Sequence, residues 1–286
     1  MRYGRFGSAV AAAAVGVAGI GGVAAASGNG STSTLGTAYS ATLAAKTARL
    51  GLHSTVVTGV GANRKTVTIA GQGLTALRGG PTTMTLQVPT VGMLITRLIV
   101  PMVYVQLPPA LRASAPGGKA WIGINLDALA KAKLGGGLSQ LSSSANAQNT
   151  ALGVLAAQVV GAPHKVGLAR IHGTVTTAYK VTLNLGKAAA GVPLAAQAEL
   201  KRLAAKLGST TLPVEVWLDA QGRLRQLTYH VSVRATAKTP PAMVSSTVDL
   251  WDFGVPVNVV APPASQVLNV TAQALAAAGG SGSLGG

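Results

Sequence analysis

The stretch LPVEVWLDAQGRLRQLTYHVSV, residues 212–233, decides the fold. Apolar residues recur at every second position on both sides of the tetrapeptide DAQG at 219–222, which is the period of a β-strand. Within the tetrapeptide, Asp219 can accept hydrogen bonds from the backbone that follows it, and Gly222 tolerates a positive φ. The sequence therefore predicts a β-hairpin. Its period of two leaves open whether the buried face meets a packed core or a cavity.

Further strands are predicted on both sides of this hairpin, because short apolar or alternating runs recur along the chain. Glycine and proline separate them, and proline interrupts a strand because it has no N–H to donate. The first six runs follow one another without a helix, which favours an antiparallel meander over alternating strands and helices. The predicted strands are 53–60, 65–74, 82–88, 93–100, 102–107, 119–126, 165–171, 175–185 and 245–253.

Helices are expected to cover the sheet. Their apolar residues recur at intervals of three and four, and a glycine follows the first and the last of them. Asp127 is expected to cap the second, and Pro193 suits the first turn of the last. The predicted helices are 38–50, 127–134, 144–160 and 193–207.

The N-terminus is predicted to be a secretory signal over residues 1–26, with a weak membrane anchor as the alternative. Two arginines come first, an uncharged run of Ala, Val and Gly follows, and three alanines fit the small-residue cleavage rule. Residues 27–37 are rich in Gly, Ser and Thr and indicate a flexible linker. We expect the folded domain at 38–265 and a tail at 266–286 that is disordered at its end.

The charge of the chain favours anionic surroundings. There are 23 Lys and Arg against 6 Asp and Glu, a net charge of +17. Anionic lipid headgroups, wall polymers and nucleic acid all fit this excess, and a merely solvated surface is the alternative. Basic residues never occur more than two in a row, and only 3% of residues are aromatic. Nucleic acid is therefore not expected as a partner.

Residue patterns that catalysis or metal binding would need are missing from the sequence. There is no cysteine, and the four histidines lie far apart without a paired-ligand spacing. No GxSxG motif is found in the folded part. Glu215 and Asp219 share one face of a strand that ends in a turn, where capping or solvated carboxylates are more common than an acid pair. No enzyme activity, metal or cofactor is predicted.

Five phrases carry a resemblance to a known family. They are the hairpin stretch at 212–233, GMLITRLIVPMVYVQLP at 92–108, GKAWIGINL at 118–126, KVGLARIHGTVTTAYKVTLNL at 165–185 and WDFGVPVNVVAPP at 251–263. In phrasing and order the chain resembles the actinobacterial lipoproteins of the LppX and LprG type, and more broadly the LolA-like carriers. The resemblance implies an α+β fold: one strongly curved antiparallel sheet, an open half-barrel, with helices across its concave side and an apolar cavity between.

The same resemblance implies an exported, monomeric protein of the cell envelope. Its members bind acylated lipids or glycolipids and carry them across the envelope, so we expect a lipid or glycolipid ligand and an envelope transporter as partners. The positive net charge adds an anionic membrane surface as an expected partner. One feature departs from the family. Members carry a cysteine for lipid anchoring after the small residues, and here Ser27 follows Ala26. Free secretion and retention by an uncleaved N-terminus both stay open.

The cavity is expected to have the usual size of a small-ligand site, roughly 300 to 1,000 Å³. A core with few aromatic residues leaves such room, although a fully packed core is the alternative. The candidate lining residues are apolar and come from strand faces and the helix at 144–160. They are Met84, Leu86, Val88, Met93, Ile95, Val103, Val105, Leu152, Leu155, Val216 and Leu218.

A second function class is a basic protein that binds anionic wall polymers or a membrane surface without a lipid cavity. This hypothesis requires lysines and arginines to gather on one face of the molecule. The sequence offers a set that could do so: Arg64, Lys65, Arg78, Arg223 and Arg225.

Overall fold

In the computed structural model of the chain, the described residues are 34–89, 91–113, 115–131, 159–184, 209–233, 235, 240–273 and 275. Several predicted segments lie outside them. These are the secretory signal, most of the linker, the helix at 193–207, all but the last two residues of the helix at 144–160, and the end of the tail.

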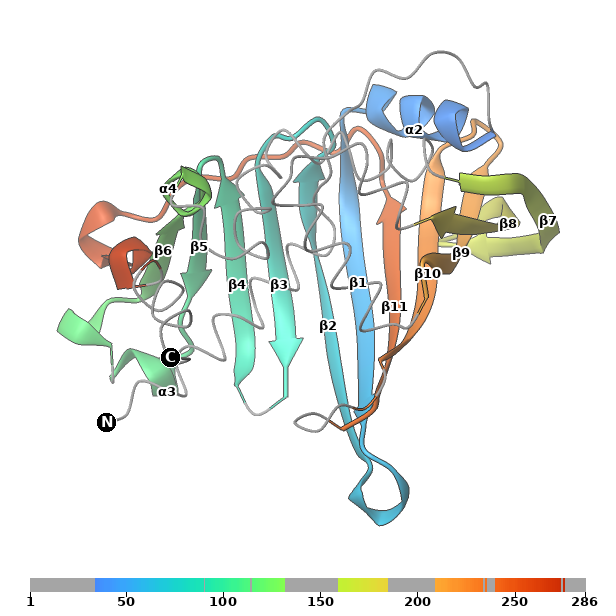
Figure 1. The fold of residues 1–286 in the computed structure, drawn as a ribbon. Coiled ribbons are helices and arrows are strands. Elements are labelled where there is room, and N and C mark those ends of the chain that lie inside the picture. The colour runs from blue at the N-terminus through green and yellow to red at the C-terminus, as the bar shows by residue number, and fades with distance from the viewer. Residues whose placement is uncertain are drawn as a thin grey trace.

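One open, strongly curved sheet contains every strand of the described residues (Figure 1). Each strand predicted from the sequence is confirmed, with its ends shifted by up to six residues. The strands are β1 Thr47–Thr58, β2 Lys65–Ala76, β3 Thr82–Val88, β4 Gly92–Ile99, β5 Met102–Gln106, β6 Trp121–Asn125, β7 Val159–Ile171, β8 Thr174–Asn184, β9 Thr211–Asp219, β10 Leu224–Val233, β11 Ala242–Trp251 and β12 Val267–Asn269.

The sheet consists of two antiparallel meanders joined side by side. Its order is β12-β6-β5-β4-β3-β2-β1-β11-β10-β9-β8-β7, so the first strand of one meander pairs with the last strand of the other. Among the described pairs, β12 with β6 alone is parallel. β12 and β7 form the two edges, and the sheet between them does not close. The predicted fold class, an open curved antiparallel sheet, is confirmed.

The predicted hairpin at 212–233 is formed by β9 and β10, with Val216 opposite Leu227. Its turn is built as the sequence indicates. The backbone N–H groups of Gln221 and Arg223 donate to Oδ1 of Asp219 at 3.0 and 2.9 Å, and Gly222 has a φ of +74°.

The first predicted helix, 38–50, is wrong after residue 44. α2 is Thr34–Ala44, and β1 begins at Thr47. Residues after 46 become a strand because β2 and β11 pair with them from both sides, which satisfies their backbone groups and buries Leu50. Gly51, expected to end the helix, lies within β1, where a Cβ would sit 3.0 Å from the Trp251 ring.

Two short helices occur elsewhere, α3 Pro109–Arg112 and α4 Leu126–Lys131. α4 corresponds to the predicted helix at 127–134, but its cap is not Asp127. The backbone N–H of Ala128 donates to the side-chain oxygen of Asn125 at 3.0 Å, so Asn125 caps this helix.

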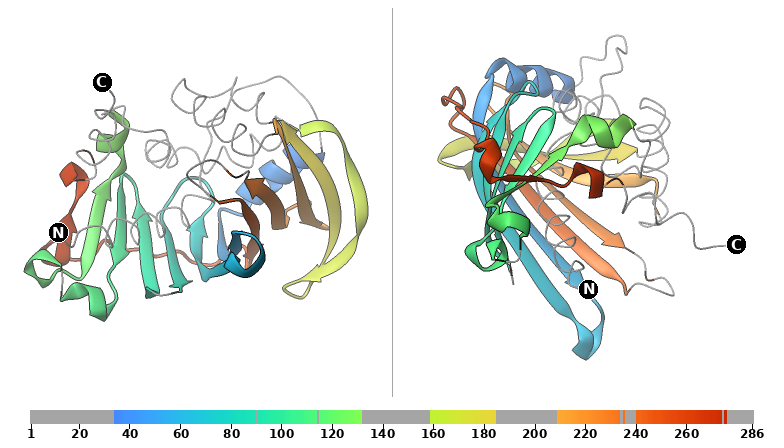
Figure 2. Two further views of the ribbon diagram at one scale, coloured as in Figure 1. Left: turned by 60° about the horizontal axis from the view of Figure 1, so that its bottom comes forward. Right: turned by 90° about the vertical axis from the view of Figure 1, so that its left-hand side faces the viewer.

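Two glycines let β3 approach β2 closely. A Cβ on Gly73 would lie 1.9 Å from the carbonyl oxygen of Thr83, and one on Gly71 would lie 2.6 Å from Cδ2 of Leu86. Any larger residue would push the strands apart. Glycine at both positions therefore allows the sheet to bend inward beside its middle strand, as the two views of Figure 2 show for the sheet as a whole.

The segment after β11 returns across the sheet to its far edge. Arg97 of β4 donates to the carbonyl of Val260 at 2.8 Å, and Lys119 donates to the carbonyl of Ser265 at 2.6 Å. β12 then pairs with β6 through Val267 and Trp121, beyond the expected domain end at 265.

Candidate functional site

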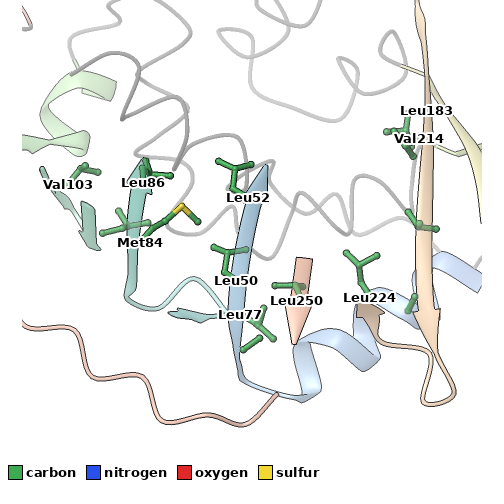
Figure 3. Close-up of a cluster of buried hydrophobic side chains, with 14 of the residues drawn as sticks. Leu50, Leu52, Leu77, Met84, Leu86, Val103, Leu183, Val214, Leu224 and Leu250 are labelled. Atoms are coloured by element: carbon green, nitrogen blue, oxygen red, sulfur yellow. The ribbon is translucent and has the colours of Figure 1, made fainter. Parts of the chain in front are cut away.

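Apolar side chains from every second residue line the concave face of the sheet. Met84 of β3 lies opposite Thr96 of β4, and Thr96 lies opposite Val105 of β5, so these three side chains project from the same face. Figure 3 shows Met84, Leu86 and Val103 at one end of this face. The predicted lining residues on β3 and β5 are all buried on it: Met84, Leu86, Val88, Val103 and Val105.

Met93 and Ile95 lie on the opposite, convex face, so their prediction as cavity residues is wrong in register. They pair with Gln87 and Thr85, whereas the neighbours Leu94 and Leu98 point inward and are buried. Met93 is 60% exposed. Both alternating sets of β4 are apolar, so hydrophobicity did not separate them. Arg97, which belongs to the set of Met93 and Ile95, was the signal that this set faces water.

The predicted residues Val216 and Leu218 lie at the other end of the concave face. Val216 of β9 is opposite Tyr179 of β8 and Leu227 of β10, and both predicted residues are buried. The remaining two predicted residues, Leu152 and Leu155, lie outside the described residues. Figure 3 places Leu183, Val214 and Leu224 at this end.

A small apolar pocket lies here between α2 and the strands β8 to β10. Its cavity volume is about 20 Å³, which is enough for a water molecule but far below the expected volume of a lipid site. All the lining residues are apolar except Tyr39, which adds a hydroxyl. They are Leu35, Ala38, Tyr39, Val181, Leu183, Val214, Val216, Leu218, Leu224 and Leu227.

The helix predicted at 38–50 was not expected to line a pocket, and its first turn was missed because residues 27–37 look like a linker. The signal was nevertheless present. Leu35, Ala38 and Thr42 recur at intervals of three and four, which places them on one face of a helix, and all three are buried. Burial raises the pKa of the Tyr39 hydroxyl above its usual value, so this group stays neutral at physiological pH.

Thr42 fastens α2 to the sheet. Its hydroxyl donates to the carbonyl of Ala38 at 2.6 Å and accepts the backbone N–H of Leu224 at 2.8 Å. Thr42 is fully buried, so water cannot replace either bond. This bridge holds α2 across β10, next to the pocket.

A buried ion cluster lies beyond Leu218 and Leu224. Oδ2 of Asp219 accepts from Nε of both Arg223 and Arg225 at 2.9 Å, and both guanidinium groups stack on the Phe253 ring at 4.7 and 4.8 Å. Burial by itself would raise the pKa of Asp219. The hydrogen bonds from the Arg223 backbone and from the side chains of Arg225 and Arg223 outweigh it and lower that pKa below its usual value. Asp219 is therefore ionised at neutral pH.

Within the part of the chain that the structure describes, no three His, Cys, Asp or Glu side chains come together as metal ligands. Among the same residues, no helix is long and apolar enough to cross a membrane. What the site offers chemically is an aliphatic surface with one hydroxyl, which suits a ligand rich in CH₂ groups.

No protein-family model matches the chain, and no curated protein matches it in sequence. Solved structures do show similarity. The lipoprotein LppX of Mycobacterium tuberculosis is 14% identical with a TM-score of 0.44, and the match covers 80% of this chain and 100% of that one. LprF of Mycobacterium bovis is 13% identical with a TM-score of 0.44, covering 80% and 95%. A LolA superfamily protein of Nitrosomonas europaea is 10% identical with a TM-score of 0.30, covering 79% and 93%.

Proposed function

We propose that the protein is exported, binds the acyl chain of a lipid or glycolipid against the concave face of its sheet, and carries it across the cell envelope. The observation that supports this most is the lining of the pocket under α2, which is aliphatic apart from Tyr39. An acyl chain loses no hydrogen bonds in such surroundings, and each CH₂ removed from water contributes about 0.8 kcal/mol. A polar ligand would leave its own groups unpaired there.

The pocket must widen to hold a chain, and α2 is the wall that can move. Among the described residues, α2 has its principal contacts with β10, and the Thr42 bridge is its buried hydrogen-bonded link to that strand. The residue Lys46, with a φ of +66°, lies between α2 and β1 and marks the bend about which the helix is placed. A ligand that separates α2 from β8 to β10 would replace the helix contacts with its own.

The proposal is tested by mass spectrometry of organic extracts from the protein purified out of its own host. We expect the parent to carry acylated lipid and Val216→Trp, which fills the pocket, to carry less. Met93→Trp adds the same ring on the exposed convex face and should carry the parental amount. Ala38→Leu is a smaller pocket-filling change if Val216→Trp does not fold. A parent without lipid, or pocket variants with the parental amount, would overturn the proposal.

The alternative, a polyanion-binding face without a lipid site, is not favoured by the placement of its five cations. Arg223 and Arg225 are paired with Asp219. Arg78 donates to the carbonyl of Leu43 in α2, whereas Arg64 and Lys65 lie at the other end of β2, about 40 Å away along the strand. The five residues therefore form no common face.

The envelope transporter remains part of the proposal as the partner that receives or delivers the ligand.

Val103→Trp, at the far end of the concave face, tests how far along that face the ligand extends. Loss of lipid in this variant as well as in Val216→Trp would indicate a chain that runs from β9 to β5.

A further inference from the structure

The hairpin of β1 and β2 protrudes from one end of the sheet (Figure 1). β3 pairs with β2 from Ala70 onward, and β11 pairs with β1 as far as Thr58. Residues 59–64 therefore extend past both neighbouring strands. The 3₁₀ turn Gly61–Asn63 forms the end of this protrusion. We call residues 56–67 the hairpin tip.

The tip exposes apolar side chains that a folded protein would usually bury. Val60 is 70% exposed and Val67 is 42% exposed. Met243 of β11, opposite Val57, is 52% exposed on the other face of the sheet from Val67. Exposed apolar groups on a protruding element indicate a surface that becomes covered by a partner.

The apolar surface of the tip continues into the concave face. Along β1, Leu50, Leu52 and Val56 project from the same face, and Val56 lies opposite Val67. Leu50 is 1% exposed and Leu52 is 8% exposed, compared with 42% for Val67. Only Ser54 interrupts this row on β1, and its partner on β2 is Ile69. An apolar track therefore leads from the core to the tip.

Positive charge accompanies these apolar side chains. Arg64 and Lys65 are both exposed at the tip. No Asp or Glu precedes residue 127 in the chain, and the first acidic residue along the neighbouring β11 is Asp249, seven positions from Ala242. The cations at the tip thus have no acidic partner on β1, β2 or the adjoining part of β11. Exposed valines next to cations that have no acidic neighbour on these three strands match the acyl boundary and the phosphates of an anionic lipid surface.

We propose that the hairpin tip docks on an anionic bilayer, with Val60 and Val67 at the acyl boundary and Arg64 and Lys65 against the lipid phosphates. The docking deepens the proposed function and rests on it, since the apolar track would connect that bilayer with the concave face. An anionic polymer would attract the two cations but would leave the valines exposed to water.

The absence of cysteine from the chain allows a site-specific test. Val60→Cys, labelled with an environment-sensitive fluorophore, should shift its emission to the blue on vesicles that contain phosphatidylglycerol, and not on phosphatidylcholine alone. Leu168→Cys is the matched control, because Leu168 is 69% exposed on β7 at the edge of the sheet. Equal shifts at both labels, or none at Val60, would overturn the proposal.

Charge and apolar contributions are separated by vesicle sedimentation. Arg64→Glu with Lys65→Glu should weaken binding to anionic vesicles by roughly tenfold or more, and Val60→Asp should weaken it too. Lys180→Glu, an exposed charge reversal on β8, should have a much smaller effect. The single variants Arg64→Glu and Lys65→Glu are compared with Lys180→Glu, since each changes one charge. If Lys180→Glu weakens vesicle binding as much as either of them, the attraction is general and the tip is not the docking site.

Failure of the docking and failure of lipid binding give different results. The tip variants should still bind a soluble fluorescent fatty acid, while Val216→Trp should lose that probe and still bind anionic vesicles. A parent that binds vesicles but no fatty acid would refute the carrier alone. A parent that binds the fatty acid but no anionic vesicles would refute the docking alone.

Discussion

The two faces of the sheet are built from different amino acids. The concave face is mostly aliphatic, with Met84, Leu86 and Leu50 among its most buried side chains. The three tryptophans of the chain, at 121, 217 and 251, each follow or precede a concave residue by one position and therefore lie on the convex face. The aromatic exceptions on the concave side include Tyr179 and Tyr229.

On the convex face the bulky rings have polar partners in fixed positions. His172 stacks on Trp251 with ring centroids 4.2 Å apart, and Arg97 lies 4.6 Å from the Trp121 ring. Gln226 donates to Asp249 at 2.7 Å. These contacts are directional and define one arrangement. Aliphatic side chains have no such directional preference and repack around a changed volume at lower cost. We therefore expect the convex face to be rigid and the concave face to be adaptable.

The largest expected effect is a loss of stability when the directional contacts of Asp219 are removed. Asp219→Ala leaves Arg223 and Arg225 without their buried carboxylate and removes two backbone hydrogen bonds in the turn. We expect the free energy of unfolding to fall by about 3 to 5 kcal/mol in urea titrations. Asp252→Ala is the control, since its pair with Arg49 is exposed and should contribute less than about 1 kcal/mol. Equal losses in the two variants would mean that burial of the Asp219 cluster adds nothing.

The next largest effect compares how much a side chain on the concave face and one on the convex face contribute to stability. Leu86→Ala removes a fully buried side chain from the concave face, and a cost of about 2 to 5 kcal/mol is typical of such a cavity. Met93→Ala, on the neighbouring strand but facing water, should change stability by less than about 0.5 kcal/mol. A loss below about 1 kcal/mol for Leu86→Ala would contradict this expectation and would show that the concave face closes readily around missing volume.

A smaller effect is expected where the sheet bends. Gly73→Ala would place a methyl group against the Thr83 carbonyl, and separating the strands should cost about 1 to 3 kcal/mol in chemical denaturation. Gly167→Ala on β7 meets nothing within 4 Å and should be close to neutral. A neutral Gly73→Ala would show that the close approach of β2 and β3 is not needed for the fold.

The existence of the strands could be predicted from the sequence, and so could the turn at Asp219 and Gly222, because both depend on local spacing and residue type. The pairing of β1 with β11 could not, since it joins residues about 200 positions apart without a local signal. That pairing also decides that residues 47–50 are strand and not helix. Local propensity was outweighed there by hydrogen bonds to two neighbouring strands.

The candidate site was predictable where one face of a strand is clearly polar. The alternation of β3, with threonines and Gln87 between its apolar residues, placed Met84, Leu86 and Val88 on the same face. On β4 both alternating sets of side chains are apolar enough to be buried, and Arg97 was the single charged residue that indicated which set faces water. The start of α2 was missed because Thr34, Gly36 and Thr37 resemble a linker, so the helix was predicted only from residue 38, although the apolar surface of β8 to β10 stabilises it from residue 34.

The smallest effect is the pH dependence of the Asp219 cluster. The pKa of this carboxyl is lower in the folded protein than the usual value of an aspartate, so the unfolded chain takes up the proton first as the pH falls. The stabilisation is therefore fully present above about pH 5 and decreases as the pH falls below 4 toward the folded pKa. Asp219→Asn keeps an acceptor for the turn but carries no charge, so the difference in unfolding free energy between parent and variant isolates this group from the other carboxylates. We expect that difference to be constant between about pH 5 and 7 and to shrink at lower pH, measured by urea titration at each pH. A difference that stays constant down to about pH 3 would mean that folding does not lower the pKa of Asp219.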